Sequence, residues 1–225
     1  MSSNIYKLLT WLSPSFPVSS YAYSHAFEQL IEKKIIKNGE DCFEYIVCLL
    51  ENGSLKIDAV LINNLYKAIE EKNDNKILEI INYYQSFFPS KEFQSESFFQ
   101  GEALFKTAFP LWSCKELDVL KSFNISNMSY VVVLCFLAKG HSIKSSTLAI
   151  SYLHAFVSNL VSCAIRLIPL GQTEGQLIIS KLEKIIENST IENKDKLIEE
   201  VGSSMVLHDI ASMRHEHLTN RLFRS

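Results

Sequence analysis

Apolar side chains recur at helical spacing along most of this 225-residue chain, and that pattern limits the fold more than any other feature. The clearest stripe lies in residues 18–36, at positions i, i+3, i+4, i+7, i+8 and i+12. Its members are Tyr23, Ala26, Phe27, Leu30, Ile31 and Ile35. Proline and glycine, which interrupt helices, number only five and seven. The spacing therefore predicts an all-α protein.

The same spacing predicts a bundle of roughly ten helices in a single domain that spans residues 1–225. After the first helix, the others are expected at about 41–52, 54–72, 74–88, 91–109, 114–122, 127–140, 145–168, 173–187, 195–201 and 204–213. Residues 131–138 are apolar on every side, so this helix should lie at the centre of the core. Its valines would also suit a strand, but no partner strand is visible.

Composition argues against two classes of partner. The formal net charge is −3, which gives no overall basic field for nucleic acid. No uninterrupted apolar run approaches the roughly 18 residues that cross a bilayer, and Ser13-Pro14 ends the N-terminal apolar run too early for a signal sequence. The five cysteines form no C-x-x-C pair, so we expect reduced thiols in a cytoplasmic protein.

Motifs of catalysis are missing from the sequence. It contains no G-x-x-x-x-G-K-[ST], no G-x-G-x-x-G, no H-E-x-x-H and no Glu-x-x-His of a di-iron bundle. Nothing in the sequence therefore argues for an enzyme, and we expect a protein that is not one; a helical enzyme of unknown type stays a third, weaker alternative.

Three polar residues stand close together in the first expected helix. His25 and Glu28 are three residues apart on its polar side, and Ser24 precedes them. They could form a polar cluster or half of a metal site, or they could simply face solvent or a partner.

PLGQTEGQ, residues 169–176, predicts a corner between two helices. Pro169 should end one helix, Gly171 permits a positive φ, and Thr173 should cap the next with Gln176 as its capping-box partner. Gly175 lies inside that second helix, where it costs about 1 kcal/mol relative to alanine. Its small size indicates close approach by other atoms, from this chain or from a partner.

The last segment, SMRHEHLTNRLFRS at residues 212–225, is locally basic. Arg214, Arg221 and Arg224 suit bidentate contacts with carboxylates, and Leu222 and Phe223 would add an apolar anchor. The segment holds almost no apolar repeat, so it should not fold on itself. We expect a docking tail that becomes ordered on a partner.

The histidines near this end offer a second hypothesis. His208, His215 and His217 could bind Ni²⁺ or Zn²⁺ through their imidazole rings. In that case the protein would be a helical carrier of Ni²⁺.

Three stretches together resemble the UreF family of urease accessory proteins. They are SPSFPVSSYAYSHAFE near the start, RLIPLGQTEGQ in the last third and SMRHEHLTNRLFRS at the end. ESFFQGEAL, residues 96–104, resembles the central helix of the family. Gln94 and Lys91 stand where the family often has arginine, which puts in doubt a charge-based role for that helix but not membership.

The resemblance implies an all-helical, dimeric protein that is not an enzyme. It implies a bridge between UreD (also called UreH) and the GTPase UreG, acting on apo-urease to insert nickel in a GTP-dependent way. No cofactor would be tightly bound, and Ni²⁺ would only be in transit. The residues that match the family motifs are Pro17, Tyr23, Ser24, His25, Glu28, Gly171, Gln172, Gly175, Gln176, Arg214, His215, Glu216, Arg221 and Arg224.

Overall fold

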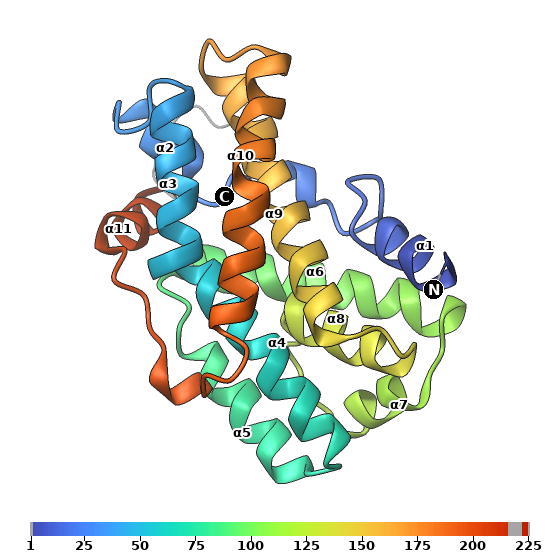
Figure 1. Cartoon of the computed structure of the whole chain (residues 1–225). Coiled ribbons are helices and arrows are strands. Elements are labelled where there is room, and N and C mark those ends of the chain that lie inside the picture. Colours follow the sequence, from blue (N-terminus) through green and yellow to red (C-terminus); the bar gives the residue numbers. More distant parts are fainter. Residues whose placement is uncertain (1, 216–221, 225) are drawn as a thin grey trace.

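A computed structural model describes residues 2–215 and 222–224, and every regular element in them is helical (Figure 1). The expected all-α fold is therefore confirmed. The elements are α1 (Ser2–Trp11), η1 (Ser20–Ala22), α2 (Phe27–Glu32), α3 (Gly39–Asn52), α4 (Ser54–Glu70), α5 (Asp74–Gln85), α6 (Lys91–Leu111), α7 (Lys115–Ser122), α8 (Tyr130–Gly140), α9 (Ser145–Leu167), α10 (Gln172–Glu192), η2 (Ile198–Glu200) and α11 (Val206–His215).

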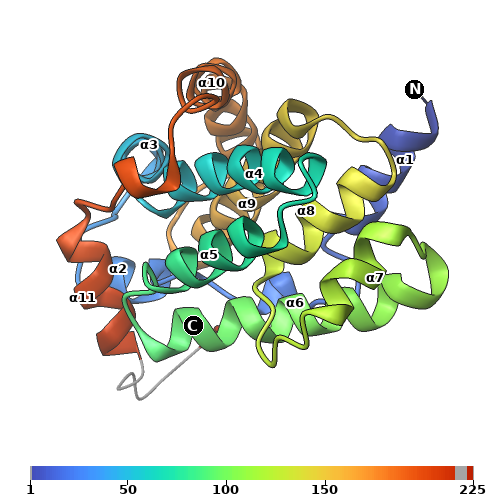
Figure 2. The same cartoon turned by 90° about the horizontal axis from the view of Figure 1, so that it is seen from below.

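Helix α8 occupies the centre of the core, as its composition predicts. All eight residues from Val131 to Ala138 are buried. Helices α4, α6, α7 and α9 pack around it, and Figure 2 shows α8 between α4 and α6. Because no side of α8 is left for solvent, an apolar residue is required at each of these positions.

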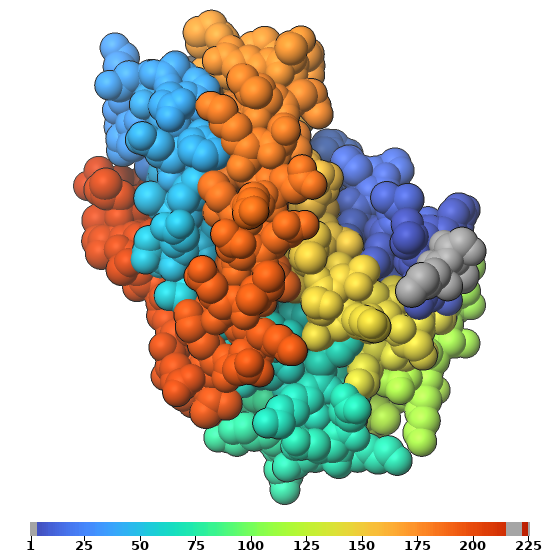
Figure 3. Space-filling view, in the orientation of Figure 1, coloured from blue at the N-terminus to red at the C-terminus, as the bar shows by residue number. Residues whose placement is uncertain are grey.

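Helix α10 lies across the outside of the bundle, between α3 and α9 (Figure 3). It ends at Glu192, five residues beyond the predicted end, because its polar residues have partners inside the fold. Ser189 is buried and its hydroxyl donates to the Leu50 carbonyl at 3.3 Å. Thr190 is also buried and donates to the Ile186 carbonyl at 2.9 Å.

The N-terminal region differs most from the sequence prediction. Residues 2–11 form a helix that the short apolar run did not predict, and this helix buries Leu8 and Trp11. The Trp11 ring meets the edge of Trp112 with centroids 6.0 Å apart. The single long helix predicted from the apolar stripe in residues 18–36 is wrong, because only Ser20–Ala22 and Phe27–Glu32 are helical there.

A side chain caps the start of α6, whereas α7 and α10 begin without one. The Ser90 hydroxyl accepts the Phe93 amide and begins α6. The predicted capping box at Thr173 is wrong, since α10 begins at Gln172 without a side-chain cap.

Helix α9 has the length and composition to cross a membrane, with 23 residues. Half of that apolar window is buried inside the bundle, as in the core helix of a globular protein, so the observation is weak evidence for a membrane span. All five cysteines are free thiols.

Candidate functional site

The YSHAFE segment, Tyr23–Glu28, consists of a tight turn at Tyr23–Ala26 followed by Phe27 and Glu28, the first two residues of α2; we call it the YSHAFE loop. His25 and Ala26 have φ angles of 51° and 66°, in the left-handed region that residues with a Cβ rarely adopt. This turn separates η1 from α2 and points His25 into the protein. The expectation that His25 and Glu28 share the polar face of one helix is therefore wrong, because α2 begins only at Phe27.

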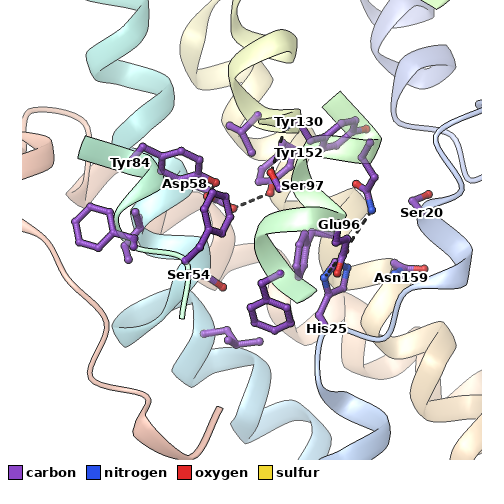
Figure 4. A pocket seen from close by; sticks show the side chains of 18 of the residues that line it. Ser20, His25, Ser54, Asp58, Tyr84, Glu96, Ser97, Tyr130, Tyr152 and Asn159 are labelled. Atoms are coloured by element: carbon purple, nitrogen blue, oxygen red, sulfur yellow. Dashed lines mark hydrogen bonds and ion pairs between the residues drawn. The ribbon is translucent and has the colours of Figure 1, made fainter. Parts of the chain in front are cut away.

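His25 is paired with a carboxylate of α6. Its Nδ1 lies 2.9 Å from Glu96 Oε1, and the two side chains are 13% and 5% exposed (Figure 4). The amide of Gln100 donates to the same Glu96 oxygen at 3.2 Å. The imidazole also lies against Phe156, with ring centroids 4.2 Å apart. These contacts bind the loop to both α6 and α9.

The main chain of the loop is anchored on α9. The carbonyl of Tyr23 accepts the side-chain amide of Asn159 at 3.1 Å and the thiol of Cys163 at 3.6 Å. Ser24 is fully buried, and its hydroxyl accepts the Glu28 amide at 3.4 Å. Pro17 stands before the loop, exposed in a turn.

Glu28 accepts two hydrogen bonds from the main chain of the C-terminal segment. One carboxylate oxygen accepts the Leu222 amide at 2.6 Å, and the other accepts the Phe223 amide at 3.1 Å. The amide of Arg224 donates to the Ala22 carbonyl at 2.8 Å. Residues 194 positions apart along the chain thus meet at one carboxylate.

Phe223 secures this contact. Its side chain is only 4% exposed, and the Arg166 guanidinium lies over its ring at 4.5 Å. Arg224 also hydrogen-bonds the Tyr23 side chain, whose pKa is raised chiefly by burial. In the protein by itself, residues 222–224 thus contact the YSHAFE loop and α9, and docking of the 212–225 segment on a partner stays a prediction.

Helix α11 carries its apolar residues on the outside. Val206, Leu207, Ile210 and Met213 are 63%, 64%, 40% and 52% exposed, at helical spacing on one face. The opposite face is buried against α2 and α6 and includes His208, Ala211 and Ser212. We call the four exposed residues the α11 stripe. Arg214 is exposed close to it.

His208, one of the three predicted metal ligands, is buried inside the protein. It is 3% exposed, its Nδ1 lies 2.6 Å from the Tyr45 hydroxyl, and its ring packs on Phe93. Burial, aided by the charge of His25, lowers the pKa of His208 to about 3, so the ring is neutral. Within residues 2–215 and 222–224 no three potential ligands are grouped to hold a metal ion. His217, Glu216 and Arg221 lie outside the described residues, as does the His215 side chain.

In the corner between α9 and α10, packing within this chain explains why Gly175 is a glycine. Gly171 has an ordinary φ of −75°, so the predicted positive φ is wrong. A Cβ on Gly175 would lie 2.6 Å from the Ile165 side chain, so the close approach predicted there comes from α9. Gln172 and Gln176 are exposed and line a groove with Arg166.

Sequence reasoning singled out the YSHAFE residues but missed most of their partners. Asn159 and Asp58 carry no local motif, and only their positions in the fold relate them to the loop. Arg166 begins the RLIPLGQTEGQ stretch, but its contact with Phe223 was not predicted. Glu96 lies in the ESFFQG stretch, among phenylalanines that are expected to be buried. An acid in that setting could have been predicted to be buried with a partner.

Comparison with known proteins places residues 36–183 within the UreF family model. A urease accessory protein UreF of Bradyrhizobium sp. is 35% identical over 98% of this chain and 92% of its own length. That of Rhodopseudomonas palustris is 32% identical over 100% of this chain and 94% of its own. That of Roseobacter denitrificans is also 32% identical, over 100% and 96%.

Proposed function

Because this chain belongs to the UreF family of urease accessory proteins, we propose that it is a non-enzymatic bridge in urease maturation. In this proposal a cytoplasmic homodimer joins UreD (UreH) to the GTPase UreG. The complex then acts on apo-urease and supports GTP-dependent insertion of nickel, which is cargo rather than a cofactor of this chain.

The α11 stripe is the observation that carries the proposal. Helices on the surface of a globular protein normally expose their polar side, whereas α11 exposes four apolar residues. A contiguous exposed apolar patch is typical of a protein–protein contact. Exposed Arg214 beside it suits a carboxylate at the rim of such a contact.

The contacts that hold residues 222–224 support a partner contact on the same side of the molecule. Glu28 and Arg166 hold this segment on the YSHAFE loop, and α11 packs on α2, which carries Glu28. Leu222 is 63% exposed and adds apolar area to that side of the molecule. We propose that UreD contacts α11 together with the seated segment.

A pull-down with purified UreD, UreG and apo-urease, with and without GTP, tests the proposal. Leu207→Asp/Ile210→Asp should reduce UreD capture at least tenfold, because it places charge in a desolvated contact. Leu177→Asp is the matched control, since Leu177 is 55% exposed on α10, away from α11. Removal of residues 214–225 should also abolish capture while the circular dichroism spectrum stays helical. Full capture by both altered proteins would defeat the proposal.

Direct nickel carriage is the second candidate. His208 contributes little to it, because its Nδ1 is engaged by Tyr45 and its ring is buried. Equilibrium dialysis of the isolated protein against Ni²⁺ separates the two candidates. Tight stoichiometric binding that is lost in His215→Ala/His217→Ala would favour carriage, and weak binding would favour the bridge.

A further inference from the structure

A cavity of about 140 Å³ lies between the YSHAFE loop and helices α4, α5, α6, α8 and α9 (Figure 4). It is close in size to an engineered cavity that admits benzene. Aromatic rings make up much of its wall: Tyr84, Phe87, Phe88, Phe93, Tyr130, Tyr152 and Phe156. The cavity is therefore large enough for a small organic molecule and lined by the faces and edges of rings.

Asp58 contributes a buried carboxylate to this cavity. The residue is 5% exposed, and its oxygens accept the hydroxyls of Tyr84 at 2.7 Å and Tyr152 at 2.6 Å. Both donors are neutral. Among the described residues that line the cavity there is no lysine or arginine. His25, the nearby imidazole that can carry a charge, is engaged by Glu96.

Among the described residues Asp58 forms no salt bridge: the charge of His25 lowers its pKa, but the His25 ring itself is paired with Glu96. Buried charges in proteins are normally paired, because hydrogen bonds alone recover only part of the lost hydration. Burial raises the pKa of Asp58 to about 6, against the hydrogen bonds of the two tyrosines, so the group is still largely ionised at pH 7. A cation inside the cavity would supply the missing charge.

The side chains around the cavity favour an organic cation over a metal ion. In the described part of the chain, no three histidine, cysteine, aspartate or glutamate side chains are grouped to hold a metal ion. His208 already uses Nδ1 on Tyr45. The wall combines several aromatic rings with the carboxylates of Asp58, Glu96 and Asp209. Aromatic rings beside a carboxylate are the chemistry that recognises alkylammonium groups, through cation–π attraction and charge.

We propose that this cavity binds a small alkylammonium ion, with Asp58 as its counter-ion. Tyr84 and Tyr152 orient the carboxylate by their hydroxyl groups, and the surrounding rings enclose the alkyl groups. His208 and Asp209 of α11 line the cavity, but no residue of the α11 stripe does, and the proposal does not depend on the proposed bridging function.

Choline and its uncharged isostere 3,3-dimethylbutan-1-ol test the proposal, because they share shape and differ in charge. Calorimetric titration of the full-length protein at pH 7.5 should show choline binding at least tenfold tighter than the alcohol. Asp58→Asn should remove this preference. Glu79→Gln is the control, since Glu79 is an exposed acid on α5.

Equal affinity of wild type for the two compounds, or no binding of either, would overturn the proposal. Unchanged choline preference in folded Asp58→Asn would also overturn it, since the counter-ion would then be another group. If that variant does not fold, the comparison of the two compounds on wild type still decides. Contacts from choline methyl protons to aromatic protons, measured by nuclear Overhauser effects, should place the ligand among the rings.

Discussion

At the scale of single residues, two consecutive residues with left-handed backbone conformation set the geometry of the candidate site. His25 and Ala26 adopt positive φ angles, a conformation that costs a residue with a Cβ roughly 1–2 kcal/mol. The cost is offset by contacts that the turn makes available, namely His25 with Glu96 and Glu28 with residues 222–224. The loop and the C-terminal segment therefore depend on each other.

Glu28→Gln should loosen the C-terminal segment. Hydrogen bonds to a charged group contribute about 1.5–3 kcal/mol each, and the amide has only one accepting oxygen. Hydrogen exchange at the Leu222 and Phe223 amides should become at least tenfold faster, with exchange in α8 unchanged. Glu79→Gln should leave these rates as they are. Unchanged exchange in Glu28→Gln would show that the segment is held by other contacts.

Asp58 should make stability depend on pH. Its folded pKa of about 6 lies above the ordinary value of 3.8. The folded protein thus keeps a proton that the unfolded chain has released, so this contribution is full below about pH 4 and is lost as pH rises through 6. Asp58→Asn cannot ionise. Its stability relative to wild type should therefore rise by roughly 2–3 kcal/mol between pH 4 and pH 7.5. Urea unfolding at both pH values measures this difference, and a constant difference would contradict the assignment.

At the scale of helices, packing decided where each element lies. Helices α8 and α9 could be predicted because their apolar spacing agrees with their burial. The break at His25 and Ala26 could not, because the apolar stripe continues across it and alanine is rare in a left-handed turn. The contact between Glu28 and Leu222 was also beyond prediction, since nothing local relates positions so far apart.

Gly101 shows how closely one helix is packed. A Cβ at this position would collide with the main-chain carbonyl of Met128, just before α8. Although alanine normally favours a helix by about 1 kcal/mol, Gly101→Ala should lower the free energy of unfolding by about 2 kcal/mol or more. Gly202→Ala, with open space around it, is the matched control and should change stability by less than about 0.5 kcal/mol. Denaturant unfolding of both variants checks the prediction.

At the scale of the whole molecule, segments from the two ends of the chain meet beside a helix whose outer face is apolar. The N-terminal loop holds residues 222–224, and α11 covers α2 and α6 with its polar and small residues turned inward. The family assignment was within reach of the sequence, because three separated motifs carry it. The α11 stripe was not, since its apolar residues would ordinarily have been assigned to the core.

Hydroxyl-radical footprinting of the protein alone and in complex with UreD probes that face. The account predicts at least threefold lower oxidation of Leu207 and Met213 in the complex, with Leu177 unchanged. Equal oxidation of Leu207 and Met213 in the two states would contradict it.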